Sequence, residues 1–305
     1  MKRTFVCECI NSGFVAGETI SLEFIWPGPA PKAGQFFLIK PKRTGMFLGR
    51  PISFAGWIPS GQGSGKSSAK GGPAKKGTTT EGDITTDSGI TTNSGILRFL
   101  IVRRGQGTRE LTDLRSGEEA ELTGPLGNYW TGAEILKDIS KNKSGGAVAL
   151  VGGGIGIAPL LPFARELEVY PESPIPYDFY AGFRSHSFGI NTIAAGINTI
   201  SARSLTITSE DGSEGLKGRI PDFFTPSGYR AVFTCGPEPM IKAIGDACIA
   251  SEVPCFISVE RHMACGVGAC LGCTVKTIGQ GEGGYKHCCT DGPIFRAEEL
   301  CFEKH

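Results

Sequence analysis

The cysteines of this chain gather near its C-terminus. Six of the 11 fall in the last 41 residues. Cys265, Cys270 and Cys273 are spaced C-x4-C-x2-C, and the adjacent Cys288 and Cys289 follow. This spacing is typical of plant-type 2Fe–2S clusters, which take a fourth thiolate from further along the chain. The pattern predicts an iron–sulfur cluster, with Cys288 and Cys289 both open as the fourth ligand.

Three glycines, Gly266, Gly268 and Gly272, lie among these cysteines. Glycine lets the backbone fold closely over a cluster and direct N–H groups toward its sulfur atoms. The alternatives are a structural zinc site or free buried thiols. A zinc site usually has two C-x2-C-like pairs, whereas here three cysteines share one short segment. The arrangement therefore favours iron–sulfur over zinc.

A glycine-rich segment, 152–159, follows an apolar run at 147–151 and precedes a helix-like stretch. Glycines let the backbone approach a pyrophosphate, and the N-terminus of a helix favours its negative charge. The segment departs from G-x-G-x-x-G because Pro159 takes the place of the last glycine. A dinucleotide site is the functional interpretation, and a tight structural turn is the alternative.

Cys235 follows another apolar run, 231–234, and is itself followed by Gly236 and Pro237. Ligands of open parallel sheets bind beyond the carboxyl ends of the strands, where this turn would lie. Cys235 is therefore a candidate for contact with a bound ligand. The alternative is that its side chain serves only as a small buried hydrophobe.

These candidate sites need two kinds of scaffold. Residues 4–130 contain short runs rich in β-branched and aromatic residues, at 36–39, 52–58 and 97–102, which suit a closed antiparallel barrel. From about residue 146, apolar runs alternate with helical stretches such as 160–167, which predicts a parallel α/β sheet. The expected strands of that sheet are 147–151, 177–181, 205–208 and 230–234.

The expected domains are therefore a barrel over 1–135, an α/β domain over 145–250 and a small module over 251–305 with little regular structure. Residues 59–95 are almost wholly Gly, Ser, Thr and Lys, and we expect an inserted loop between two barrel strands. A short repeat at 189–200 receives no function.

Composition narrows the function class. The 305 residues carry a net charge of +1, which gives no sign of a nucleic-acid or membrane surface. No apolar run approaches the roughly 18 residues of a membrane-spanning helix, and the N-terminus has no secretory pattern. An odd number of cysteines without such a signal favours metal or redox use over disulfides. We expect a cytoplasmic protein.

Taken together, the motifs resemble the ferredoxin reductase superfamily. Its dinucleotide turn, G-x-G-x-x-P, is similar to Gly154, Gly156 and Pro159, and its flavin strand is similar to Arg50-Pro51-Ile52-Ser53. The resemblance implies that Arg50 contacts the FAD phosphates, that Ser53 approaches the isoalloxazine and that Cys235 is catalytic beside the nicotinamide. A solvated Arg50 on an edge strand is the alternative. The implied FAD residues are Arg50, Pro51, Ile52, Ser53, Leu100, Ile101, Val102, Gly107 and Thr108, and the implied nicotinamide dinucleotide residues are Gly153, Gly154, Gly156, Pro159, Gly236 and Pro237.

Residues 258–273 and 289–295 are most similar to one branch of that superfamily, the electron-transfer subunits of type B dihydroorotate dehydrogenases. This resemblance selects Cys289 as the fourth ligand beside Cys265, Cys270 and Cys273. It implies FAD, a 2Fe–2S cluster and NAD as substrate. It also implies a heterotetramer with an FMN-containing catalytic subunit that oxidises dihydroorotate in pyrimidine biosynthesis. Arg184 would be placed to pair with a 2′-phosphate, so the residues leave NADP open.

Two other functions stay open. One is the flavin subunit of a ferredoxin:NADP oxidoreductase or of a hydrogenase-linked reductase. The other is a non-catalytic scaffold that binds a cluster. No segment of the sequence is identified as a dihydroorotate site, and no room remains for an FMN-binding barrel of about 250 residues.

Overall fold

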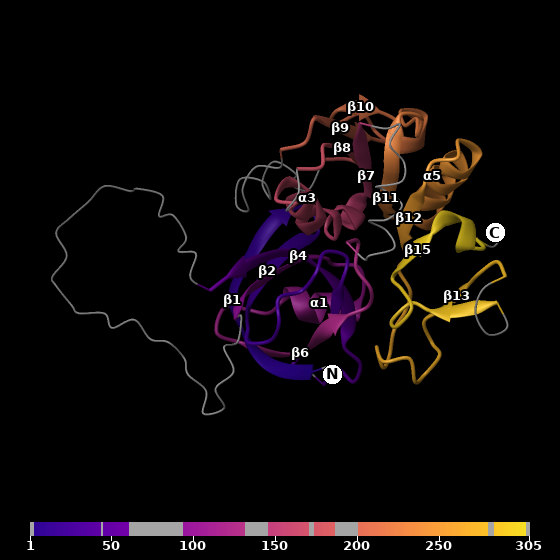
Figure 1. Ribbon diagram of the computed structural model, residues 1–305. Coiled ribbons are helices and arrows are strands. Elements are labelled where there is room, and N and C mark those ends of the chain that lie inside the picture. Colours follow the sequence, from indigo (N-terminus) through magenta and orange to yellow (C-terminus); the bar gives the residue numbers. More distant parts are fainter. Residues whose placement is uncertain are drawn as a thin grey trace, which may run out of the picture.

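The computed structural model describes residues 3–43, 45–60, 94–131, 146–170, 174–186, 201–279 and 284–302. It consists of a barrel, a seven-stranded sheet with its helices, and a two-stranded C-terminal hairpin beside both (Figure 1). Most of the predicted insertion at 59–95 and the whole repeat at 189–200 lie outside the described residues. In the described part of the chain, no helix is long and apolar enough to cross a membrane.

The first domain is a closed barrel of six antiparallel strands in the order β1-β2-β5-β4-β3-β6. The strands are β1 Arg3–Ala16, β2 Thr19–Trp26, β3 Phe36–Pro41, β4 Arg50–Pro59, β5 Gly95–Val102 and β6 Glu119–Leu126. Phe37 fills the centre, with its ring edge-on to Trp26 at 5.0 Å and to Phe99 at 5.6 Å. Helix α1, Gln106–Thr112, adds Leu111 to this core. The predicted antiparallel barrel is confirmed.

The two ends of the predicted insertion meet. Pro59 at the end of β4 pairs with Gly95 at the start of β5, and Ser60 N donates to Ser94 O at 2.9 Å. The two ends of the predicted insertion therefore lie on neighbouring barrel strands.

The second domain is built on a sheet of order β10-β9-β8-β7-β11-β12-β15, in which all neighbours are parallel except β12 and β15. Its central strand β7 is buried along its whole length, as an apolar run between two helical layers must be. The elements are β7 Ala147–Gly153, η1 Gly154–Ile157, α3 Leu160–Glu168, β8 Tyr177–Phe183, β9 Ser204–Ser209, β10 Leu216–Lys217, η2 Ile220–Asp222, β11 Tyr229–Cys235, α5 Glu238–Ala250, β12 Cys255–Ser258 and β15 Ile294–Arg296.

The expectation of little regular structure after residue 250 was wrong. That segment holds β12 and β15 of the large sheet, a hairpin of β13 Thr274–Lys276 and β14 Tyr285–His287, and η3 Ala297–Glu299. Strands of three or four residues are too short to show a period in the sequence, and they form here because they pair with strands distant in the chain. The proposed boundary at 250 therefore falls inside the sheet of the second domain.

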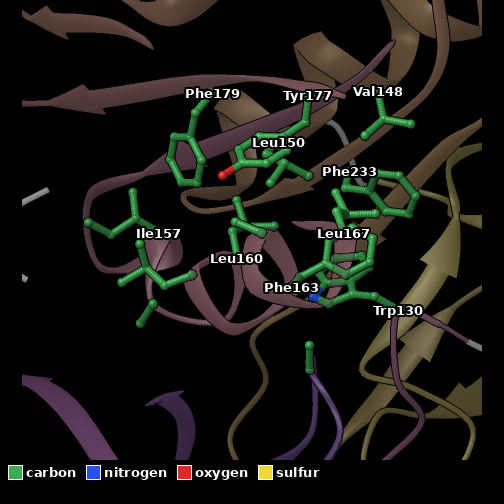
Figure 2. Packing of buried hydrophobic residues seen from close by; sticks show 14 of the residues in the cluster. Trp130, Val148, Leu150, Ile157, Leu160, Phe163, Leu167, Tyr177, Phe179 and Phe233 are labelled. Carbon is green, nitrogen blue, oxygen red and sulfur yellow. The ribbon is translucent and has the colours of Figure 1, made fainter. Parts of the chain in front are cut away.

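The barrel and the α/β domain share one apolar core around α3 (Figure 2). Trp130, which follows the barrel, stacks on Phe163 of α3 and meets Phe233 of β11 edge-on. Its indole N–H donates to Pro159 O at 3.3 Å. At the other end of α3, Glu166 accepts hydrogen bonds from Ala33 N at 2.8 Å and from the Thr131 hydroxyl at 3.2 Å. Helix α3 is thus fixed to the barrel side at both ends.

Candidate functional site

The cysteine-rich loop directs backbone N–H groups at its own sulfur atoms. Val267 N and Cys270 N each lie 3.4 Å from Cys265 Sγ, and Gly268 N lies 3.2 Å from Cys289 Sγ. The Val267 donor, with that of Cys270, lowers the pKa of the Cys265 thiol to about 6, because N–H donors stabilise a thiolate. The loop is therefore shaped to hold sulfur in its anionic form, as metal ligation requires.

The four predicted ligands form two pairs. The Cys265 thiol contacts that of Cys270, and the Cys273 thiol contacts that of Cys289. Among the described residues, no three histidine, cysteine or acidic side chains converge as a single metal ion would require. A binuclear cluster needs two thiolates on each iron, so two neighbouring pairs fit it better than they fit zinc.

The two adjacent cysteines point to different places. The Cys288 thiol is buried and donates to Val259 O at 3.3 Å, and burial raises its pKa to about 12. Cys289 instead turns toward the loop, where it meets Gly268 N and the Cys273 thiol. Of the two adjacent cysteines, Cys289 therefore lies nearer to the other three predicted ligands, and its role as the fourth ligand stays a prediction.

The predicted flavin strand lies at the start of β4, where Arg50 and Ser53 pair with Ile39 and Phe36 of β3. The Arg50 side chain packs against Gly107, so closely that a Cβ on Gly107 would collide with the guanidinium. A guanidinium fork beside bare backbone fits the diphosphate of a dinucleotide. Pro51 and Ile52, between Arg50 and Ser53, are half-buried.

Gly107 and Thr108, the implied FAD residues that follow the strand β5, lie in the first turn of α1. Its geometry depends on Thr108, whose hydroxyl accepts from Arg104 N and Gly105 N and donates to Gly105 O. On the strand leading into it, Leu100 packs in the core shared by the two domains and Ile101 in the barrel core, while Val102 is half-buried. The side chains of Leu100 and Ile101 thus serve packing.

The two glycine turns of the α/β domain touch at the carboxyl edge of the sheet. Cys235 at the end of β11 lies opposite Gly152 of β7. A Cβ on Gly156 would overlap the Cys235 carbonyl, and one on Gly153 would lie 2.6 Å from Met240 Sδ. Gly236 adopts φ +155°, a conformation suited to glycine. Pro159 precedes the first residue of α3, and Pro237 that of α5. The sequence predicted one site for these residues, and the structure brings them together.

The Cys235 thiol is buried beside two residues that the sequence motifs did not indicate as part of this site. Ser258, its register partner on β12, forms a side-chain hydrogen bond with it, and the Glu260 carboxylate lies near enough to act on it. Burial, with a smaller contribution from Glu260, raises the pKa of Cys235 well above its usual range, so the thiol is neutral. Both residues lie at the start of 258–273, the segment whose resemblance to one branch of the superfamily pointed to the cluster and not to the nicotinamide.

Comparison with known proteins decides the family. The sequence model of the iron-sulfur cluster binding domain of dihydroorotate dehydrogenase B matches residues 260–301. The dihydroorotate dehydrogenase B (NAD(+)) electron transfer subunit of Clostridium perfringens is 36% identical over 88% of this chain and 87% of its own. That of Caldanaerobacter subterraneus subsp. tengcongensis is 32% identical over 99% and 100%. This chain belongs to the family of dihydroorotate dehydrogenase B electron transfer subunits.

A solved structure supports the fold. The NADH-dependent reduced ferredoxin-NADP oxidoreductase superposes with a TM-score of 0.67 at 24% identity, over 97% of this chain and 89% of that one. At this identity the likeness shows the fold alone. The predicted combination of an antiparallel barrel, a parallel-sheet domain and a C-terminal iron–sulfur module is confirmed for this electron transfer subunit.

Arg184, the residue that left NADP open as an alternative to NAD, lies near two acidic residues. Arg184 is exposed just after β8, and its carbonyl accepts from Asp211 N at 3.3 Å. Glu210, which precedes Asp211, forms an ion pair with Arg219. The names of the relatives give NAD(+).

Proposed function

We propose that this chain carries electrons from the FMN of a dihydroorotate dehydrogenase catalytic subunit to NAD⁺, by way of a 2Fe–2S cluster and FAD. The proposal is supported by the packing of the cysteine-rich loop 265–273 directly against the flavin-type barrel. A Cβ on Gly266, inside the cluster loop, would meet Leu38 and Leu126 of that barrel. The cluster loop and the flavin domain therefore share one boundary, as electron transfer between them requires.

Bound FAD exchanges both single electrons and pairs, which suits a protein that lies between a one-electron cluster and a hydride acceptor. The chain itself supplies binding and orientation. Arg50 and Gly107 receive the FAD diphosphate, with Pro51, Ile52, Ser53 and Thr108 shaping the adjoining surface. Gly153, Gly154, Gly156 and Pro159 receive the dinucleotide pyrophosphate at the edge of the sheet.

The residues at the end of β11 form the site proposed for hydride transfer. Gly236 and Pro237 lead the chain from the end of β11 into α5, beside the place proposed for the nicotinamide at Cys235. A neutral buried thiol places no charge beside that ring, and Ser258 fixes its orientation by a hydrogen bond. Cys235 is proposed as the catalytic residue on this geometry.

The partner is proposed to be an FMN-containing catalytic subunit, and the complex a heterotetramer that acts in cytoplasmic pyrimidine biosynthesis. The thiol of Cys270 is exposed, and so are the side chains of Val267 and Leu271 on the same loop. Exposed apolar side chains around a cluster suit a surface that a partner covers. Cys265, Cys270, Cys273 and Cys289 are proposed as the cluster ligands.

The test uses the purified chain with its cofactors loaded. The chain alone should reduce an artificial dye from NADH yet show no NAD⁺ reduction with dihydroorotate. Addition of an FMN-containing catalytic subunit should create that activity. Dihydroorotate turnover by the chain alone would contradict the proposal. Dye reduction without any response to the catalytic subunit would favour a ferredoxin- or hydrogenase-linked reductase.

A further inference from the structure

One side chain at the end of the barrel is bonded entirely to the cluster-binding segment. Asn128 Nδ2 donates to Asp291 O at 3.0 Å and to Ile294 O at 2.8 Å, while Asn128 Oδ1 accepts from Ile294 N at 3.0 Å. Its backbone N–H donates to Gly292 O at 2.7 Å. These four bonds join parts of the chain more than 160 residues apart.

The bonded segment begins two residues after Cys289. Thr290 lies against Gly268 of the cluster loop, where an added Cβ would come within 3.0 Å of the Thr290 methyl. Asp291 turns back on its own loop, since its carboxylate accepts from His287 N at 2.6 Å. The backbone that presents Cys289 is therefore short, tightly folded and held at its far end by Asn128.

The barrel side of this contact is equally close. Gly127 faces the cluster segment so closely that an added Cβ would lie 2.6 Å from Pro293 and 2.9 Å from Gly292 O. Gly127 also has φ +78°, a conformation that glycine adopts without strain. The turn at 127–128 therefore sets how closely the flavin domain and the Cys289 segment approach one another.

We propose that Asn128 is a positioning residue that fixes the cluster relative to the flavin, and with it the rate at which electrons cross between them. The inference rests on the proposed function. It assigns Asn128 no contact with either group, because its side chain is fully engaged with backbone at 291–294.

The side-chain chemistry explains why an amide stands here. Two carbonyl groups and one N–H face position 128, and an asparagine amide supplies two donors and an acceptor in one plane. An aspartate would keep the bond from Ile294 N but would set a carboxylate against two carbonyl oxygens. An alanine would leave all three backbone groups without this partner, and unpaired polar groups are costly.

The experiment compares the loaded wild-type protein with Asn128→Asp and Asn128→Ala. Gln35→Ala is the matched control, because the Gln35 amide donates to Gly127 O at 3.0 Å within the barrel side of the same turn. Each protein is assayed for FAD and iron content. Stopped-flow mixing with NADH then separates bleaching of the flavin from bleaching of the cluster. Hydrogen exchange of peptides covering 288–296 measures how firmly that segment is held.

Both Asn128 variants should keep FAD and reduce it at a rate within about two-fold of wild type, while cluster bleaching slows by about ten-fold or more. Hydrogen exchange in 288–296 should be faster in both variants. Gln35→Ala should show neither the slower cluster bleaching nor the faster exchange. If Asn128→Ala loses iron but still reduces its flavin, the segment that carries Cys289 has been released, as proposed. The rate of cluster bleaching is then measured on Asn128→Asp.

Cluster bleaching within about two-fold of wild type in the iron-loaded Asn128→Asp protein would overturn the positioning role. So would equal slowing in Gln35→Ala. A wild-type protein whose cluster never bleaches with NADH would instead contradict the proposed function, so the two failures are distinguishable.

Discussion

Cys235 and Ser258 stand side by side at the carboxyl ends of β11 and β12, with a hydrogen bond between thiol and hydroxyl. The two residues are distant in the sequence and belong to segments with different predicted tasks, one to the nicotinamide turn and one to the cluster motif. Their pairing places the beginning of the cluster module next to the site proposed for hydride transfer.

Cys235→Ala should slow reduction of the flavin by NADH by about ten-fold while FAD content stays near that of wild type. The reason is that the thiol and its Ser258 partner shape the surface proposed for the nicotinamide, whereas the residues proposed to bind FAD lie on the barrel. Single-turnover kinetics with NADH measure the rate. Cys248→Ala, at a buried cysteine of α5, is the control. Unchanged kinetics in Cys235→Ala would leave its thiol a packing role only.

The adjacent cysteines should respond differently to serine substitution. Cys288→Ser should keep the visible absorbance of the cluster, because the Cys288 thiol is turned toward Val259 O. Cys289→Ser should lose that absorbance, because its sulfur lies beside the Cys273 thiol, another proposed ligand. Absorbance spectra and iron content of the two purified variants check this. The reverse pattern would assign the fourth ligand to Cys288.

Gly107→Ala should lower FAD occupancy without unfolding the barrel. A Cβ there forces the Arg50 guanidinium away from its place, while alanine is itself a good helix former within α1. Gly105→Ala is the matched control, since a Cβ at that position has nothing within 4 Å. Flavin-to-protein ratio and thermal unfolding are measured on both. Equal FAD content in the two variants would count against a phosphate site at Arg50.

Glu166→Gln should weaken the pH dependence of stability. Burial raises the pKa of the Glu166 carboxyl in the folded protein above its ordinary value of about 4.3. As pH rises, the Glu166 carboxyl therefore ionises in the unfolded chain before it ionises in the folded protein. Its contribution to stability is complete below the pKa of the unfolded chain and is lost as the pH rises through the pKa of the folded protein. The glutamine amide of the variant would keep an oxygen for Ala33 N. Melting temperatures between about pH 4.5 and 6.5 should fall more in wild type than in the variant; parallel curves would contradict this.

Removal of residues 62–92 should leave FAD content and NADH-dependent dye reduction within about two-fold of wild type, because loop-closure entropy varies slowly with length. The ends to be joined already meet, since Pro59 pairs with Gly95 and Ser60 bonds to Ser94. Flavin content and steady-state rates are the measurements. A shortened protein that no longer binds FAD would show that the segment has a structural role.

Residue type and local order were enough to predict much of this fold. The barrel strands are rich in aromatic and β-branched residues, the β7 run is continuously apolar, and the glycine turn at 153–156 lies between β7 and α3 as expected. Spacing alone indicated the cluster. These features are visible because each one is encoded within a few neighbouring residues.

Relationships over long sequence distances were not predictable in this way. The strands β12 and β15 have only four and three residues and are defined by their partners. The contact of Ser258 with Cys235 depends on the pairing of β11 with β12, and that of Asn128 with Ile294 on the packing of two domains. Such contacts are not encoded in a hydrophobic periodicity or in the spacing of a motif, so they become visible only in the folded structure.

The place of β15 has a consequence for the integrity of the molecule. It follows the cluster cysteines in the chain, yet it pairs with β12 and closes the large sheet, with Val259 N bonded to Pro293 O alongside. A chain truncated before Cys265 would therefore lose more than its iron. It would leave the backbone groups of a fully buried strand exposed at an open edge, where another chain can add and aggregation can begin. The C-terminal module of this electron transfer subunit therefore also covers the edge of the large sheet and keeps other copies of the chain from adding to it.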